Sequence, residues 1–98
     1  MILSYRDKDT ERLAKGLRVL RFAPFERIAL RKLRQLDIAG SLNDLRVPPG
    51  NHLEALTGKR SGQCSIRVND QYRVCFTWTP SGPKDVEICL LYTSDAAD

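Results

Sequence analysis

The segment RVPPGN, residues 46–51, constrains the fold of this chain more than any other stretch. Two consecutive prolines followed by a glycine cannot continue a helix, so a helix that precedes this segment must end before it. On the N-terminal side apolar residues recur at helical spacing, and on the C-terminal side they alternate with polar residues. We therefore expect helices in the first half of the chain and strands in the second half.

A short strand and a first helix are predicted at the start of the chain. Residues 1–5 are typical of a short edge strand. Residues 7–16, DKDTERLAKG, predict a helix whose free amides bond to the side chain of Asp9 or Thr10. Gly16 offers the residue at which this helix stops.

A second helix is expected to begin near Pro24, because proline is favoured in the first turn, and to end before Gly40. Residues 41–45 add a further turn. One stripe of the helix is apolar and consists of Phe25, Ala29, Leu33 and Leu36, with Ile28 beside it. The opposite face carries Arg27, Arg31 and Arg34.

Four strands are predicted after the break, because residues there alternate between apolar and polar. They cover residues 52–56, 63–68, 72–78 and 85–91. The links between them are short, so consecutive strands should pair in an antiparallel meander. A strand, two helices and then four strands predict a small α+β domain with both helices on one side of the sheet.

The hairpin formed by the second and third of these strands poses an electrostatic problem. A three-residue loop, residues 69–71, in which Asn or Asp adopts a left-handed backbone, places Arg67 directly across from Arg73. Like charges about 5 Å apart at Cβ are mildly destabilising in such a pair. Three explanations stay open: the arginines are solvated, they pair with Asp85 or Glu87, or they hold an anion from outside.

The charge of the chain is unevenly distributed. Residues 1–34 contain ten Lys or Arg and four Asp or Glu, a net charge of +6, whereas the whole chain of 98 residues is +4. A basic segment of this density favours a polyanionic partner, either nucleic acid or an acidic protein, although a solvated helix face has the same composition.

Other function classes find little support. No apolar run approaches the roughly 18 residues of a membrane span, and no signal peptide is recognisable, so we expect a soluble, cytoplasmic protein without a membrane partner. Three cysteines without a CxxC pair indicate reduced packing residues. With one histidine and no clustered ligands, neither a metal nor another cofactor is expected.

Residues 48–78, PPGNHLEALTGKRSGQCSIRVNDQYRVCFTW, closely resemble the central block of HigB-type toxins in the RelE/ParE superfamily of bacterial toxin-antitoxin systems. MILSYRDKDTERL resembles the opening segment of these toxins, and LRKLRQLDIAGSLNDL their second helix. The similarity covers residues 1–88, which we interpret as a single domain. Residues 89–98, CLLYTSDAAD, are atypical and resemble a translated cloning or sequencing artefact.

The resemblance implies a RelE-like fold of the microbial-ribonuclease type, with an N-terminal strand and two helices on a mainly antiparallel sheet of four to five strands. It implies a toxin that cleaves mRNA on the ribosome without a metal, by attack of the ribose 2′-hydroxyl on the adjacent phosphate. Its implied partners are a HigA-like antitoxin, the ribosome and mRNA, with operator DNA bound only through the antitoxin complex.

Site residues carry over position by position. Arg73 matches the family arginine at the scissile phosphate, and Arg67 suits the same or an adjoining phosphate. Glu54 stands where some members carry histidine and is a candidate base, with a charge-balancing surface carboxylate as the alternative. Further candidate RNA-binding residues are Lys59, Arg60, His52, Arg27, Arg31 and Arg34.

One departure from the family lies at the C-terminal end. Members usually finish with Asp-Tyr-His after a strand like DVEI, whereas here Ile88 is followed by Cys89 and two leucines. We therefore expect a chain that folds correctly but cleaves mRNA poorly. Two alternatives stay open: a non-enzymatic, ParE-like gyrase inhibitor, and a catalytically impaired module that binds RNA or antitoxin.

Overall fold

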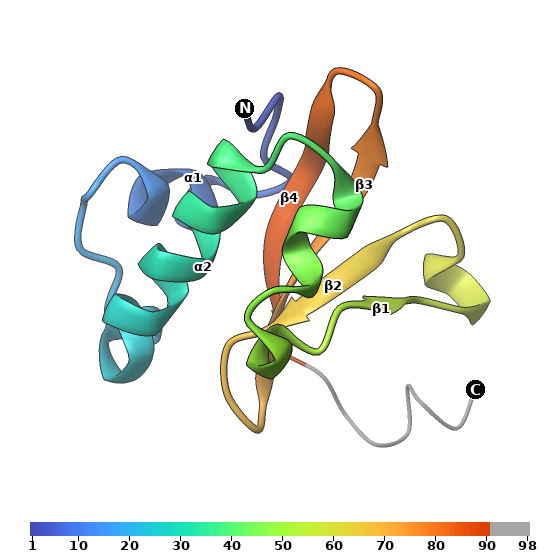
Figure 1. Cartoon of the computed structure of the whole chain (residues 1–98). Helices are drawn as coiled ribbons and strands as arrows, with labels where there is room; N and C mark the ends of the chain where they lie inside the picture. The colour runs from blue at the N-terminus through green and yellow to red at the C-terminus, as the bar shows by residue number, and fades with distance from the viewer. Residues whose placement is uncertain (91–98) are drawn as a thin grey trace.

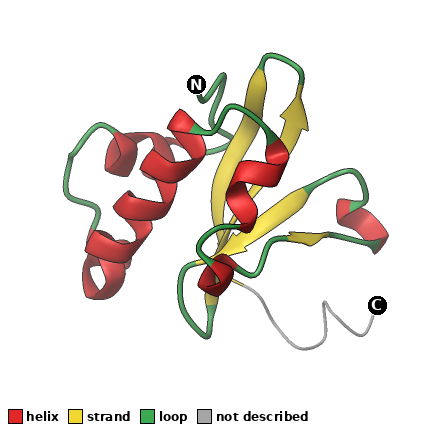
Figure 2. Cartoon of the chain, viewed as in Figure 1, coloured by secondary structure: helices red, strands yellow, loops and turns green. Residues whose placement is uncertain are grey.

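The computed structural model describes residues 1–90 and has the expected α+β architecture (Figures 1 and 2). Its helices are α1 (Lys8–Ala14) and α2 (Glu26–Ile38), and its strands are β1 (Glu54–Ala55), β2 (Cys64–Arg67), β3 (Tyr72–Thr79) and β4 (Gly82–Leu90). Short 3-10 helices cover Leu20–Phe25, Leu42–Arg46, Pro49–Asn51 and Gly58–Arg60. The strands form one antiparallel sheet in the order β1-β2-β3-β4, so the predicted meander is confirmed. Both helices lie on the same side of it (Figure 1).

The cap of α1 differs from the prediction. Asp7, rather than Asp9 or Thr10, accepts the hydrogen bond from the backbone N–H of Thr10 at 3.1 Å. Thr10 is instead fully buried, and its hydroxyl accepts from the backbone N–H of Ile88 on β4 at 3.1 Å. The helix ends at Ala14, close to the predicted stop at Gly16, which has φ +86°.

The apolar stripe of α2 fills the core as predicted. Ala29, Leu33 and Leu36 are buried, and they face a sheet surface whose apolar residues are also buried. That surface consists of Ile66, Val68, Val74, Phe76, Val86 and Ile88. Pro24, the predicted helix start, lies inside the preceding 3-10 helix, and α2 begins two residues later.

The N-terminal segment does not form the predicted edge strand. A single parallel bridge joins Tyr5 to Val86, and Leu3 N–H donates to the carbonyl of Pro83 at 2.8 Å. The segment therefore runs beside β4, but Asp7 begins the turn into α1 before a regular ladder forms. In residues 1–90 the sheet has four strands, the lower end of the predicted range.

The register of the β2–β3 hairpin is as predicted, with Ile66 opposite Val74 and Arg67 opposite Arg73. Its turn differs, because none of residues 69–71 has a positive φ. The Asn69 side chain closes the loop instead, accepting from the backbone N–H groups of Gln71 and Tyr72, each at 2.8 Å. An Asx turn of this kind needs no left-handed residue.

Candidate active site

The face of the sheet turned away from α2 is polar, because side chains alternate between the two faces along each strand. Ser65, Arg67, Arg73 and Glu87 occupy this face, and Ile66, Val74 and Val86 occupy the other. The two arginines that the sequence placed opposite each other therefore lie together outside the main core.

Arg73 is held by three neighbours and is only 6% exposed. Its Nε donates to Ser65 Oγ at 2.6 Å, its Nη2 donates to the carbonyl of His52, and its Nη1 lies 3.4 Å from Glu54 Oε1. The pKa of Arg73 is lowered, because burial lowers it by more than the Glu54 carboxylate raises it. An arginine stays protonated at neutral pH under such conditions, so this face contains a fixed positive charge.

Arg67 lies opposite Arg73 but has a separate partner and a different environment. Its Nη2 contacts Asp70 Oδ1 in the hairpin loop, and the Asp70 side chain is 89% exposed. The like charges of the hairpin are therefore balanced one by one, with Asp70 beside Arg67 and Glu54 beside Arg73. The explanation that invoked Asp85 or Glu87 is wrong.

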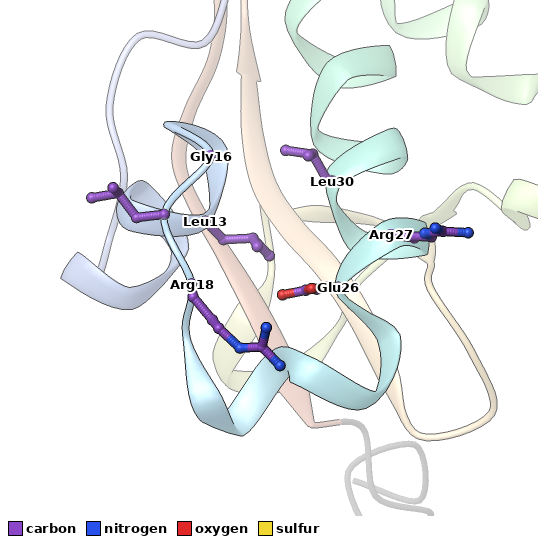
Figure 3. Close-up of a pocket in the computed structure, with 7 residues that line it drawn as sticks. Leu13, Gly16, Arg18, Glu26, Arg27 and Leu30 are labelled. Atoms are coloured by element: carbon purple, nitrogen blue, oxygen red, sulfur yellow. The ribbon is translucent and has the colours of Figure 1, made fainter.

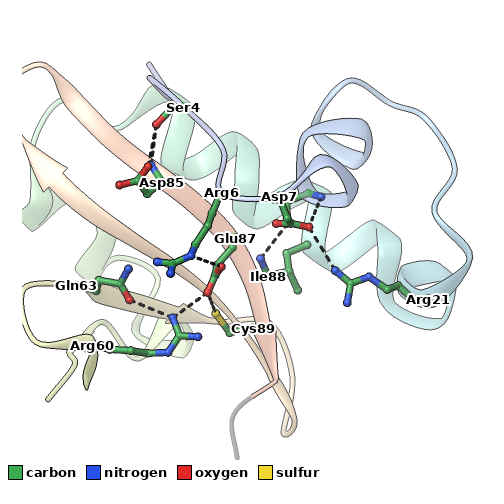
Figure 4. A network of polar contacts seen from close by, with 11 residues as sticks. Ser4, Arg6, Asp7, Arg21, Arg60, Gln63, Asp85, Glu87, Ile88 and Cys89 are labelled. Atoms are coloured by element: carbon green, nitrogen blue, oxygen red, sulfur yellow. Dashed lines mark hydrogen bonds and ion pairs between the residues drawn. The ribbon is translucent and has the colours of Figure 1, made fainter. Parts of the chain in front are cut away.

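Glu87 has other partners (Figure 4). Arg60 Nη1 lies 2.8 Å from Glu87 Oε1, and Arg6 Nε lies 3.4 Å from Oε2. The hydrogen bond to Glu87 raises the pKa of Arg60. Gln63 also accepts from Arg60, at 3.1 Å. Glu87 and its partners therefore form a cluster of paired side chains on the polar face, and this cluster holds the loop before β2.

The candidate RNA-binding residues fall into two groups. His52, Lys59 and Arg60 lie in the segments around β1, near the polar face. His52 has a left-handed backbone with φ +46°, and its carbonyl, not its ring, contacts Arg73. Arg27, Arg31 and Arg34 are exposed on the side of α2 opposite its buried stripe, so the fold does not bring them to Arg73.

Two residues of the site were missed from the sequence. Ser65 has the same strand parity as Arg67, and that signal was sufficient to place it on the polar face. Asn51 is fully buried and contacts α2 through its amide. It gave no local signal, since its partners are 16 and 19 residues away in the sequence.

A surface pocket of about 310 Å³ lies between α1 and the start of α2 (Figure 3). It is lined by Leu13, Gly16, Leu17, Arg18, Glu26, Arg27 and Leu30. None of these residues contacts Arg73 or its partners, so the pocket is separate from the polar face. Within residues 1–90, no helix has the length and apolar character needed to cross a membrane.

Comparisons with known proteins agree with this architecture. Residues 4–94 match the family model of the RelE-like toxin of the type II toxin-antitoxin system HigB. Toxin HigB-1 of Vibrio cholerae is 45% identical over 80 residues, which cover 80% of this chain and 84% of that protein. An uncharacterised protein of Haemophilus influenzae is 44% identical over 52 residues, 53% of this chain and 52% of that protein.

Among solved structures, the YoeB-YefM complex from Staphylococcus aureus contains a chain with a similar fold. The TM-score is 0.60 at 16% sequence identity, and the match covers 94% of this chain and 99% of that one. At that identity the likeness concerns the fold alone. The family match and the V. cholerae relative together establish that this chain belongs to the HigB-like toxins, RelE-like toxins of type II toxin-antitoxin systems.

Proposed function

We propose that this chain is a ribosome-dependent mRNA endonuclease whose active site is the polar face around Arg73. The observation that carries the proposal is the buried guanidinium of Arg73, which contacts Ser65, His52 and Glu54, with Arg67 directly across the hairpin. The two arginines occupy paired positions on adjacent strands, and guanidinium forks bind phosphate oxygens well.

In the proposed reaction the ribose 2′-hydroxyl attacks the adjacent phosphorus. The O2′–P bond forms and the P–O5′ bond breaks, leaving a 2′,3′-cyclic phosphate and a 5′-hydroxyl end. Glu54 takes the 2′ proton as general base, and Arg73 and Arg67 stabilise the charge that grows on the phosphate oxygens. No metal takes part in this sequence.

Substrate binding requires an exchange of anions at both arginines. In the free protein Glu54 and Asp70 neutralise Arg73 and Arg67. An RNA phosphate takes the place of these carboxylates, which are 60% and 89% exposed and therefore have room to move aside. Displacement from Arg73 also leaves the Glu54 carboxylate next to the phosphate, where a base is needed.

Protonation of the leaving 5′ oxygen is the step for which we assign no side chain. Ile88 is followed by Cys89 rather than by the Asp-Tyr-His expected from the resemblance. Solvent then supplies this proton, and cleavage should be slow. We also propose that an antitoxin holds the toxin inactive in the cytoplasm and that operator DNA is bound only through their complex, as membership of a toxin-antitoxin family supports.

The test is primer extension on a reporter mRNA in a reconstituted translation system. Four proteins are compared: this chain, its Arg73→Lys variant, its Arg12→Lys variant, and a version that ends in Asp-Tyr-His after Ile88. Arg12 is an exposed arginine of α1 and serves as the matched control. Circular dichroism and thermal melting of each protein establish that it is folded.

We expect cuts only during translation, stronger cutting by the version with the restored ending, and a loss of about 100-fold or more in the Arg73→Lys variant. Lysine keeps the charge but lacks the planar fork, so the loss measures the geometry of the contact. Equal cutting by the Arg73→Lys and Arg12→Lys variants would contradict the assignment. No cuts from any folded version, together with inhibition of gyrase supercoiling, would support a non-enzymatic inhibitor instead.

A further inference from the structure

We propose that Asn51 is a positioning residue for Arg73: by joining the loop after Pro48-Pro49 to α2, it fixes the His52 carbonyl and the Glu54 carboxylate that contact the guanidinium. The consequence for cleavage rests on the function proposed above. The positioning itself is a property of the fold and is testable without any activity.

The side chain of Asn51 is fully buried, and its amide is used completely. Its Nδ2 donates to Gln35 Oε1 at 3.0 Å and to the carbonyl of Leu45 at 3.1 Å. Its Oδ1 accepts from the ammonium group of Lys32. Two of these partners come from α2 and one from the 3-10 helix that precedes the proline pair, so a single side chain joins three parts of the fold.

The next residues lead directly from this anchor to the site. His52 has a left-handed backbone, which is unfavourable for a residue other than glycine and persists only when its surroundings impose it. Its carbonyl accepts from Arg73 Nη2. Two residues further, Glu54 lies 3.4 Å from Arg73 Nη1. Two of the three neighbours of Arg73 therefore depend on the direction in which the chain leaves Asn51.

The chemistry of the anchor requires an amide. Its two donors face oxygen atoms and its acceptor faces an ammonium group, an arrangement that neither an alanine nor an aspartate reproduces. Burial lowers the pKa of Lys32, and Arg31 contributes to the same effect, which agrees with an ammonium group drawn towards the protein interior. Loss of the amide leaves buried polar groups unpaired, so the loop must shift to find new partners.

The test is NMR on the full-length chain labelled with ¹⁵N, with the Nε–H signal of Arg73 as the probe. The Arg73→Lys variant identifies this signal by its disappearance. We compare Asn51→Ala with Asn43→Ala, since Asn43 is an exposed asparagine of the neighbouring 3-10 helix. We expect Asn51→Ala to shift the Arg73 signal and to raise its rate of hydrogen exchange with water severalfold, and Asn43→Ala to leave both unchanged.

A second variant keeps the test decisive if Asn51→Ala does not fold. Lys32→Met removes the ammonium that orients the amide but retains a long side chain, and Lys15→Met at the C-cap of α1 is its matched control. Faster exchange at Arg73 in Lys32→Met, and not in Lys15→Met, supports the proposal. An Arg73 signal that is unchanged in every folded variant would overturn it.

Cleavage assays add a readout that a purely structural role would not move. They use the version that ends in Asp-Tyr-His, at a temperature at which melting curves show each variant to be folded. We expect Asn51→Ala to lower kcat and leave KM for the programmed ribosome unchanged, because orientation is lost and not binding. A raised KM with unchanged kcat would overturn the positioning role. If no version cuts at all, the proposed function fails while the NMR result still decides the inference.

Discussion

At the scale of single residues, the two arginines of the hairpin occupy paired strand positions but differ in burial and in their partners. Arg73 is buried and bonded to groups of the fold, so its position is set before any ligand arrives. Arg67 is more exposed and contacts one carboxylate in a loop, which is itself 89% exposed. Pre-organised charge is the more effective kind in a transition state, whereas an adjustable charge serves binding. We therefore propose that Arg73 acts mainly in the chemical step and that Arg67 acts mainly in binding the RNA strand.

The residue-scale prediction concerns Asp70, which forms an ion pair with Arg67 and which we propose competes with RNA for it. Asp70→Asn should raise the affinity for a fluorescein-labelled single-stranded RNA severalfold, as measured by anisotropy, because binding no longer requires displacement of a carboxylate. The free energy of unfolding in urea should change by less than about 0.5 kcal/mol, since exposed ion pairs contribute little. Glu11→Gln, which breaks the Lys15 ion pair on α1, is the control for net charge. Equal gains in the two variants would mean that Asp70 does not compete.

At the scale of elements, the sequence was most informative where one local pattern decides the outcome. Alternation set the register of the hairpin, and the proline pair separated helices from strands. Prediction failed where several residues compete or where partners are distant. DKDT offers three caps within four residues, and Asp7 is selected because Thr10 bonds to β4. The anchoring by Asn51 and the bond from Arg73 to the His52 carbonyl depend on long-range packing that no local pattern encodes.

The element-scale prediction tests the link between α1 and β4. Thr10 is fully buried; its hydroxyl donates to Asp7 at 2.7 Å and accepts from the N–H of Ile88. Thr10→Val keeps the shape but leaves the Ile88 N–H unpaired, so we expect a loss of about 1–3 kcal/mol in the free energy of unfolding. Thr10→Ser retains the hydroxyl and should lose less. Urea denaturation measures both, and a valine variant as stable as the serine variant would contradict this role.

At the scale of the whole molecule, the positive charge lies on two separate sides. The arginines of the polar face are balanced by carboxylates, which leaves little excess charge there in the free protein. Arg27, Arg31 and Arg34 lie on the outer side of α2, and none of the three forms an ion pair within residues 1–90. The sequence places the excess positive charge in residues 1–34, and the fold puts three arginines of that segment on a side away from the polar face. We propose that the two surfaces bind different RNA strands when the protein acts on the ribosome.

The whole-molecule prediction separates these roles. Replacing Arg27, Arg31 and Arg34 together by glutamine should weaken binding to programmed ribosomes. The magnitude of the slope of log affinity against log salt should fall by about 2, because binding without these three phosphate contacts releases fewer counterions. KM for the programmed ribosome should rise, whereas kcat at saturating ribosome should be unchanged, since Arg73 and its partners are not altered. The matched control replaces Lys8 and Arg12 of α1 and its C-cap residue Lys15 by glutamine, the same change in charge on another surface. If both triple variants lose affinity equally, net charge governs binding and the α2 face has no special role; if only kcat falls in the α2 variant, that face reaches the reacting strand.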